Sequence, residues 1–146
     1  MIGPDHRESS GCPIACSLDI IGDRWTLLII RDLMFMGKHE YNEFQAMPEG
    51  ISTNILADRL KRLQKEGIID SARHPMQGNK KLYYLTAAGK DLIDIMMAIV
   101  IWGAAHLKHI VDIPTEKRAM LKEPERMKKY VLTSHLEWEA AHLELR

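Results

Sequence analysis

The chain has few of the residues that cross-link small proteins. It contains two cysteines among its 146 residues, Cys12 and Cys16. Their spacing matches neither a C-x-x-C redox pair nor a four-ligand zinc layout. We therefore expect no structural disulfide and no metal site. A chain of this length can bury an adequate hydrophobic core without either of them.

Long apolar runs are also missing. No segment approaches the roughly 18–20 apolar residues that cross a bilayer. Residues 1–7 lack the charged-then-apolar order of a signal peptide. These absences predict a cytoplasmic protein with no membrane partner. The apolar fraction of 46% nevertheless predicts a folded chain rather than a disordered one.

Motifs that carry catalysis or bind cofactors are absent as well. The sequence has no phosphate-binding G-x-x-x-x-G-K-[ST], no dinucleotide-binding G-x-G-x-x-G and no nucleophilic G-x-S-x-G. Its seven histidines form no H-x-x-x-H or H-E-x-x-H pattern. We expect no cofactor and no enzymatic activity. A thiol-based enzyme that uses Cys12 and Cys16 is an alternative, which their spacing disfavours.

Net charge is zero over the whole chain, but it is unevenly distributed. Residues 1–51 carry four basic and eight acidic side chains, residues 52–81 seven and three, and residues 82–146 nine of each. A protein that binds a polyanion needs one basic face rather than a basic total, because affinity comes from the phosphates that are actually neutralised. The middle segment is therefore the candidate for binding nucleic acid.

The segment before this basic region predicts three helices. Residues 14–21 form a short apolar helix, and Asp23 is a suitable N-cap for a helix over residues 24–36. That second helix is apolar nearly all round, so it should cross the core. A third helix is expected over residues 40–47. The Pro-Glu-Gly turn at 48–50 joins it to the next helix, as in a helix-turn-helix.

The basic region itself begins with a helix that Ser52 caps and Gly67 ends. Its apolar side chains gather on one face, and the opposite face is polar near the start and basic further on. Such a face suits the major groove of DNA, where Asn pairs with adenine, Thr meets a thymine methyl or a phosphate, and Lys reaches guanine. The DNA contacts predicted on this helix are Ser52, Thr53, Asn54, Ala57, Asp58, Lys61, Arg62 and Lys65.

A hairpin should follow the helix. Residues 68–73 and 81–85 have strand-like composition, and a polar tip joins them. A capped helix followed by a hairpin with a basic tip is the order of a winged helix. We therefore predict a mainly α fold with a small β-hairpin. Asn79, Lys80 and Lys81 at the wing are predicted to enter the adjacent minor groove or to hold its phosphates.

The region after the hairpin predicts an exposed apolar surface. Thr86 can cap a helix over residues 87–109 that is apolar on more than one stripe. A single small domain cannot cover all of that surface, so the excess predicts a second subunit, with Ile95, Ile99 and Trp102 at the interface. Pro124 opens a last helix, whose seam of apolar residues suits packing on another helix.

Several short motifs carry a resemblance to a known family. They are Cys12-Pro13, Ile21-Gly22-Asp23-Arg24-Trp25, Gly50-Ile51-Ser52, Leu56, Leu60-Lys61-Arg62-Leu63, Gly67-Ile68-Ile69, Tyr84-Leu85-Thr86 and Gly89. Together, over about residues 12–107, they resemble the HxlR family of bacterial winged-helix transcriptional regulators. The resemblance implies a homodimer on a palindromic operator, with dimerisation helices that include Ile14 and Leu18. In some members of the family the cysteine that matches Cys12 senses oxidants or electrophiles, so the resemblance makes Cys12 a candidate redox sensor. The alternative is a buried, inert cysteine.

The sequence departs from this family in two segments. Gln77-Gly78-Asn79-Lys80-Lys81 stands where family wings often carry a Pro-Pro pair, which puts the wing contacts in question. The chain also continues past the usual family end. We therefore expect a flexible arm at 1–11, a winged helix-turn-helix domain with dimerisation helices at 12–112, and a C-terminal helical extension at 113–146.

The combined expectation is a transcriptional regulator. It would bind double-stranded DNA as a homodimer, most simply as a repressor, with a thiol oxidant or a small molecule as effector. A second possibility is a winged-helix module that binds a protein through the apolar helix after the hairpin and through the C-terminal seam.

Overall fold

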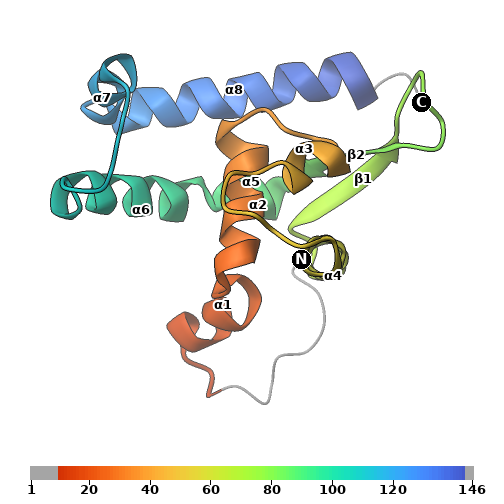
Figure 1. Cartoon of the computed structure of the whole chain (residues 1–146), viewed down its shortest axis with the longest axis horizontal. Coiled ribbons are helices and arrows are strands. Elements are labelled where there is room, and N and C mark those ends of the chain that lie inside the picture. Colours follow the sequence, from red (N-terminus) through yellow and green to blue (C-terminus); the bar gives the residue numbers. More distant parts are fainter. Residues whose placement is uncertain (1–9, 144–146) are drawn as a thin grey trace. The chain divides into compact units, whose positions relative to one another are not determined.

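The computed structural model describes residues 10–143, which form two compact units that divide after Gly89. The domain boundaries expected at residues 11 and 112 stay a prediction. Each unit is described by itself. In the first unit the elements are α1 (Pro13–Ile21), α2 (Arg24–Phe35), α3 (Tyr41–Gln45), α4 (Thr53–Lys65), β1 (Ile69–Arg73), β2 (Lys81–Leu85) and the start of α5 (Ala87–Asp91) (Figure 1).

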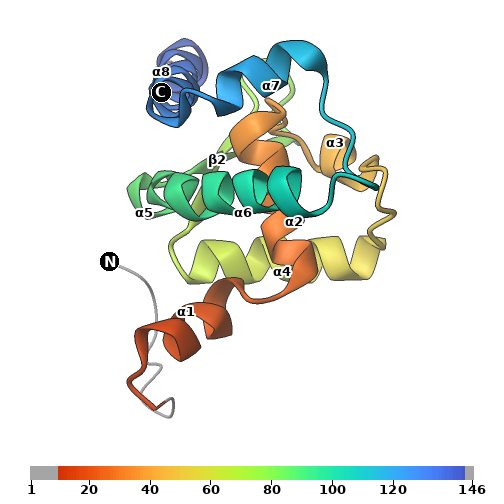
Figure 2. The same ribbon diagram turned by 90° about the vertical axis from the view of Figure 1, so that its left-hand side faces the viewer.

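Helix α2 passes through the core of this unit, as its all-round apolar composition predicts. Ile29, Ile30 and Leu33 have no exposed surface. Helix α4 crosses α2 and buries Leu56, Leu60 and Leu63 on the inner side (Figure 2). Burying one large aliphatic side chain stabilises a fold by roughly 1.5–3 kcal/mol, so these contacts dominate the placement of α4.

Local capping sets where these helices begin. The Asp23 carboxylate accepts hydrogen bonds from the backbone N–H of Thr26 at 2.9 Å and from its hydroxyl at 2.8 Å, at the start of α2. Gly50 and Gly67 stand on either side of α4 with φ of 77° and 76°. Only glycine adopts such values without strain, which explains why the chain turns sharply at both places.

The hairpin is antiparallel, with Ile69 opposite Leu85 at its base and Arg73 opposite Lys81 near its tip. The loop before α3 pairs with β2. The backbone N–H of Tyr83 donates to the His39 carbonyl at 2.8 Å, and the His39 Nδ1–H donates to the Tyr83 carbonyl at 2.8 Å. These bonds hold the middle of β2 against the loop before α3.

A close backbone approach secures the end of the hairpin. The Thr86 hydroxyl lies 2.6 Å from the Gly67 carbonyl oxygen and accepts the Gly89 N–H at 3.2 Å. A methyl group at Gly89 would collide with the Ile68 carbonyl oxygen. Position 89 therefore requires glycine, because the start of α5 lies directly against the chain that leaves α4.

The second unit contains the rest of α5 with α6 (Ile93–His106), α7 (Thr115–Leu121) and α8 (Pro124–Leu143). Helices α6 and α8 run side by side in opposite directions (Figure 1). An ion pair joins them, Lys128 to Asp94 at 2.7 Å. A second ion pair joins α5 to α8, Lys90 to Glu139 at 2.6 Å. Among the helices of residues 10–143, none has both the length and the apolar character to cross a bilayer.

The prediction of one helix over residues 87–109 was wrong in its extent, because the structure has two helices, α5 and α6, in this segment. Leu92, with ψ of −7°, separates α5 from α6, and Leu107, with ψ of 33°, ends α6 at His106. The apolar periodicity runs through both places without a proline at either. Periodicity reports which faces are buried and does not report a local change of backbone angle, so neither break could be seen in the sequence.

An ion pair ties α2 to the turn in front of α4. Arg31 Nη1 and Nη2 donate to the two carboxylate oxygens of Glu49 at 2.6 and 2.9 Å, and Arg31 Nε donates to Asp32 at 2.9 Å. This paired geometry is stronger and more directional than a single contact. The Arg31 guanidinium lowers the pKa of Glu49 from 4.5 to about 2.

This pair predicts a defined acid response of stability. Because the folded-state pKa of Glu49 is depressed, its contribution is present above pH 4.5 and is lost as the pH falls towards about 2. Replacing Glu49→Gln should lower the urea midpoint at pH 7 and should flatten its decline between pH 4.5 and 2. Urea unfolding at several pH values measures both effects.

The matched control is Glu137→Gln, which removes an exposed carboxylate on α8. This variant should keep the wild-type slope in the same pH window. Parallel stability curves for the wild type and Glu49→Gln would contradict the assignment.

Candidate nucleic-acid interface

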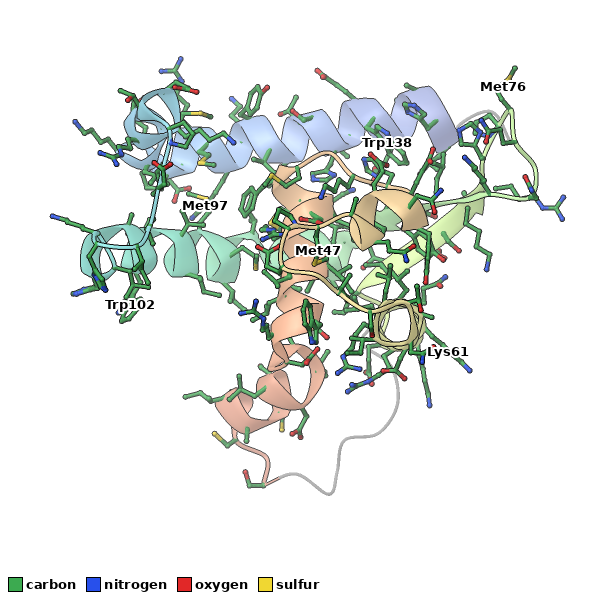
Figure 3. All side chains as sticks on the ribbon, viewed as in Figure 1. Met47, Lys61, Met76, Met97, Trp102 and Trp138 are labelled. Carbon is green, nitrogen blue, oxygen red and sulfur yellow. The ribbon has the colours of Figure 1, made fainter. Side chains whose placement is uncertain are left out.

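The outer face of α4 gathers all eight residues that the sequence singles out on this helix. Each of them is exposed, whereas the leucines of the same helix are buried. Lys61 extends outward from α4 in Figure 3. The result is one continuous polar and basic surface. Its role in binding DNA stays a prediction, although its geometry suits a helix that enters the major groove.

The first turn of α4 is held from two sides. The Ser52 hydroxyl accepts the Ile55 N–H at 3.2 Å, and the Tyr41 hydroxyl donates to the Thr53 carbonyl at 3.2 Å. Ser52 thus acts as the N-cap that the sequence predicts. The Ser52 hydroxyl is occupied by this capping hydrogen bond. The groups of this turn that can contact a phosphate are therefore its backbone N–H groups.

A chain of ion pairs connects the outer face of α4 to α2. Arg59 Nε donates to Asp23 Oδ2 at 2.7 Å, Arg59 Nη2 donates to Asp23 Oδ1 at 3.3 Å, and Arg59 Nη1 donates to Asp58 Oδ2 at 2.6 Å. The Arg59 guanidinium holds the pKa of Asp23 far below its usual value. Sequence reasoning missed Arg59, because its partner Asp23 lies 36 residues away.

The wing carries a more mixed charge than its sequence suggests. Asn79 and Lys81 are exposed, and the Lys80 side chain is 42% exposed. Glu40 approaches from the residue before α3, with its carboxylate 3.9 Å from Lys80 Nζ and 3.7 Å from His74 Nε2. Glu40 and His74 were not expected here. The carboxylate reduces the positive field that Lys80 can offer to a phosphate.

Arg73 is a further cation at the wing that the sequence did not single out. It lies directly opposite Lys81 in the hairpin, and both side chains are exposed. Like charges at facing positions destabilise a hairpin unless an anion lies near them. The polar tip at residues 74–80 could have revealed this pair, because the residues on either side of it, Arg73 and Lys81, face each other in the hairpin.

Exposed apolar residues follow one stripe of α6. Ile95, Ile99 and Trp102 recur at intervals of four and three residues and are 41%, 49% and 59% exposed. With Ala98 and Asp94 they line a largely apolar hollow. Trp102 points away from α8 in Figure 3, whereas Met97 is buried and lies on the side of α6 that faces α8. This stripe is therefore left uncovered by the other helices of its own unit.

Helix α1 exposes two apolar side chains and the Cys12 thiol. Ile14 and Leu18 are one turn apart and are 72% and 57% exposed. Cys12 is the N-cap residue of α1, is exposed, and is not part of a disulfide. Cys16, one turn further, is partly buried. The Cys12 thiol is thus accessible to a reagent in solution.

Comparison with known proteins identifies a family. The model of the HxlR-like helix-turn-helix family matches residues 20–111. The HTH-type transcriptional regulator YdeP of Bacillus subtilis is 28% identical over 120 residues, which cover 81% of this chain and 93% of YdeP. The HTH-type transcriptional regulator Rv3095 of Mycobacterium tuberculosis is 32% identical over 113 residues, which cover 77% of this chain and 70% of that protein.

Solved structures agree with these relatives. The oxidised form of the redox regulator HypR superposes with a TM-score of 0.59 and 29% identity, and covers 70% of this chain and all of HypR. The reduced form of the transcriptional regulator YodB from B. subtilis superposes with a TM-score of 0.54 and 29% identity, over 65% of this chain and 93% of YodB. The chain is therefore a mainly α, winged-helix protein and belongs to the HxlR family of helix-turn-helix transcriptional regulators.

Proposed function

We propose that this regulator binds a specific sequence in double-stranded DNA and acts as a repressor in the cytoplasm. The observation that carries the proposal is the outer face of α4. Its polar and basic side chains are exposed together, while Arg31–Glu49 and Asp23–Arg59 hold the helix and its leading turn against α2. A binding surface fixed in this way loses little conformational entropy when DNA binds.

The surface suggests a division of roles. Thr53, Asn54 and Lys61 carry side chains that can meet base edges, and Ala57 leaves room for close approach to the groove. Arg62 and Lys65 lie nearer the end of α4, where phosphates pass. Asn79, Lys80 and Lys81 of the wing, together with Arg73, would hold the neighbouring backbone, which adds affinity without sequence information.

The proposed assembly is a homodimer. Uncovered apolar stripes on α6 and α1 favour association, since an exposed patch of this kind usually marks an interface. In a two-fold dimer the two α4 helices are related by symmetry, and they would therefore select a palindromic operator.

The proposed effector is a thiol oxidant, an electrophile or a small molecule. Two observations support the thiol route. Cys12 is exposed at the start of α1, beside residues proposed for the dimer interface. HypR is described as a redox regulator in an oxidised and a reduced form. Modification of Cys12 would change operator affinity by altering how the two subunits associate.

Substitutions on α4 and the wing should weaken DNA binding in different ways. Lys61→Ala should reduce affinity for the operator by about 5- to 150-fold, the loss expected for a base contact worth about 1–3 kcal/mol. Lys80→Ala should weaken binding to operator and to unrelated DNA alike. It should also reduce the slope of log affinity against log salt concentration by about 1. Fluorescence anisotropy with DNA from upstream of the gene, at several salt concentrations, measures both.

Lys129→Ala on α8 is the control, because it removes an exposed lysine outside the proposed surface. Its affinity should match the wild type. If the wild-type protein does not bind its own upstream DNA even at low salt, the proposed function is wrong.

The dimer proposal predicts a change of mass in solution. Ile99→Glu should produce a monomer at micromolar concentration, because it would place a carboxylate in a desolvated interface. Ile110→Glu alters another exposed isoleucine, 71% exposed and outside the α6 stripe, and should remain dimeric. Sedimentation equilibrium separates the two cases. A monomeric wild type that assembles with another protein would instead favour the interaction-module alternative.

The thiol proposal predicts that oxidation changes DNA binding only when Cys12 is present. Treating the wild type with diamide or hypochlorite should shift its operator affinity at least severalfold, and a reductant should reverse the shift. Cys12→Ser should bind DNA normally and should not respond, whereas Cys16→Ser should keep the response. An unchanged response in Cys12→Ser would show that Cys12 is not the sensing thiol. A wild type that does not respond to oxidant would remove the thiol route and leave the small-molecule effector.

A further inference from the structure

One residue on the outer face of α4 has the wrong charge for simple attraction to DNA. Asp58 is an exposed carboxylate, with 54% of its side chain accessible, on the same helix face as Asn54 and Lys61. A carboxylate near the phosphates is repelled by them. Its position on this face therefore costs affinity unless it accepts a hydrogen bond from a base.

The carboxylate is held by a relay that starts at the N-cap of α2. Asp23, the N-cap of α2, binds Arg59 through Nε at 2.7 Å, and Arg59 Nη1 binds Asp58 Oδ2 at 2.6 Å. Arg59 is itself only 20% exposed, which limits its movement. Asp58 is thus restrained by a partner that is fixed to another helix, unlike an ordinary surface aspartate.

The relay leaves Asp58 able to accept a further hydrogen bond. One guanidinium serves two carboxylates, so the cluster of Asp23, Arg59 and Asp58 carries a net negative charge at neutral pH. Within residues 10–143, the hydrogen bond to Asp58 reaches Oδ2. Oδ1 therefore retains its capacity as an acceptor on the outer face of α4.

Base chemistry limits what such a group can meet in the major groove. Guanine presents two acceptors and thymine one, and both would repel a carboxylate. Adenine presents an acceptor beside its amino donor. Cytosine presents its N4 amino donor with no acceptor of its own, so it suits a fixed carboxylate best.

We infer that Asp58, positioned by Arg59 and Asp23, selects cytosine at one position of each operator half-site. This inference rests on the proposed DNA-binding function and adds to it a named base and a mechanism. Asp58 contributes mainly by penalising the other bases, since repulsion from an unpaired carboxylate discriminates more strongly than one hydrogen bond attracts.

Selection of bound sequences from random duplex DNA tests the inference. The wild type should select sites with a cytosine at one position. The Asp58→Asn variant should select mainly adenine at that position, because an asparagine amide pairs with the adenine N6 and N7. In direct binding, the wild type should prefer the cytosine site over the adenine site by about tenfold or more. Asp58→Asn should remove or reverse that preference.

Asp70→Asn is the matched control, since it removes an exposed carboxylate on β1 that accepts the Ser71 N–H. It should raise affinity for all sequences to a similar degree and leave the selected site unchanged. The positioning role is tested with Arg59→Lys, which keeps the charge but not the two-sided geometry. This variant should still prefer cytosine, with a smaller ratio between the two sites.

The outcomes separate this inference from the proposed function. If the wild type and Asp58→Asn select the same site with the same base ratios, the inference about Asp58 is wrong. The proposal of sequence-specific binding is then unaffected. If Arg59→Lys keeps the full ratio, the relay is not needed for selection. A wild type that selects no sequence would overturn both proposals.

Discussion

Helix α2 is the element on which the rest of the first unit depends. It is apolar on nearly every face and its central residues are completely buried, so neighbouring helices must pack around it. Its N-cap, Asp23, and its residue Arg31 are also the anchors of α4 and of the turn before α4. The hydrophobic core therefore sets the distance of α4 from α2, and two directional ion pairs set its orientation.

Charge is organised locally in this protein rather than as a bulk property. The chain is neutral overall, Glu40 lies among the wing cations, and Asp58 stands on the outer face of the proposed recognition helix. Strong non-specific attraction to DNA is therefore not what this arrangement favours. Individually placed donors and acceptors, restrained by neighbours, favour discrimination between sequences over affinity for any duplex.

The second unit differs from the first in the surface that it exposes. Its α6 stripe is apolar and uncovered. Asp94, which lines the hollow beside that stripe, pairs with Lys128 of α8, and Lys90 of α5 pairs with Glu139 of α8. The family match ends at residue 111, so α7 and α8 lie outside it. The ion pairs of α8 to α5 and α6 brace the helix that carries the proposed dimer interface.

Local patterns were sufficient for most of the fold and for the outer face of α4. Apolar periodicity, the caps at Asp23 and Ser52, and the turns at Gly50 and Gly67 depend on residues within one or two turns of each other, and such relations are visible in a sequence. The short motifs were also sufficient to identify the family. Together they placed all eight predicted side chains of α4 on one exposed surface.

Relations between distant residues were decided only by the tertiary structure. The partners of Arg31 and Arg59 lie 18 and 36 residues away in the sequence. Each arginine meets its partner because of the position along α2 at which α4 crosses it. The same holds for Glu40 beside Lys80, and for Gly89 against the Ile68 carbonyl. Sequence alone thus determined which face of α4 is polar. The packing of helices on a shared core determined which of its charges are restrained, since such contacts depend on crossing geometry rather than on spacing along the chain.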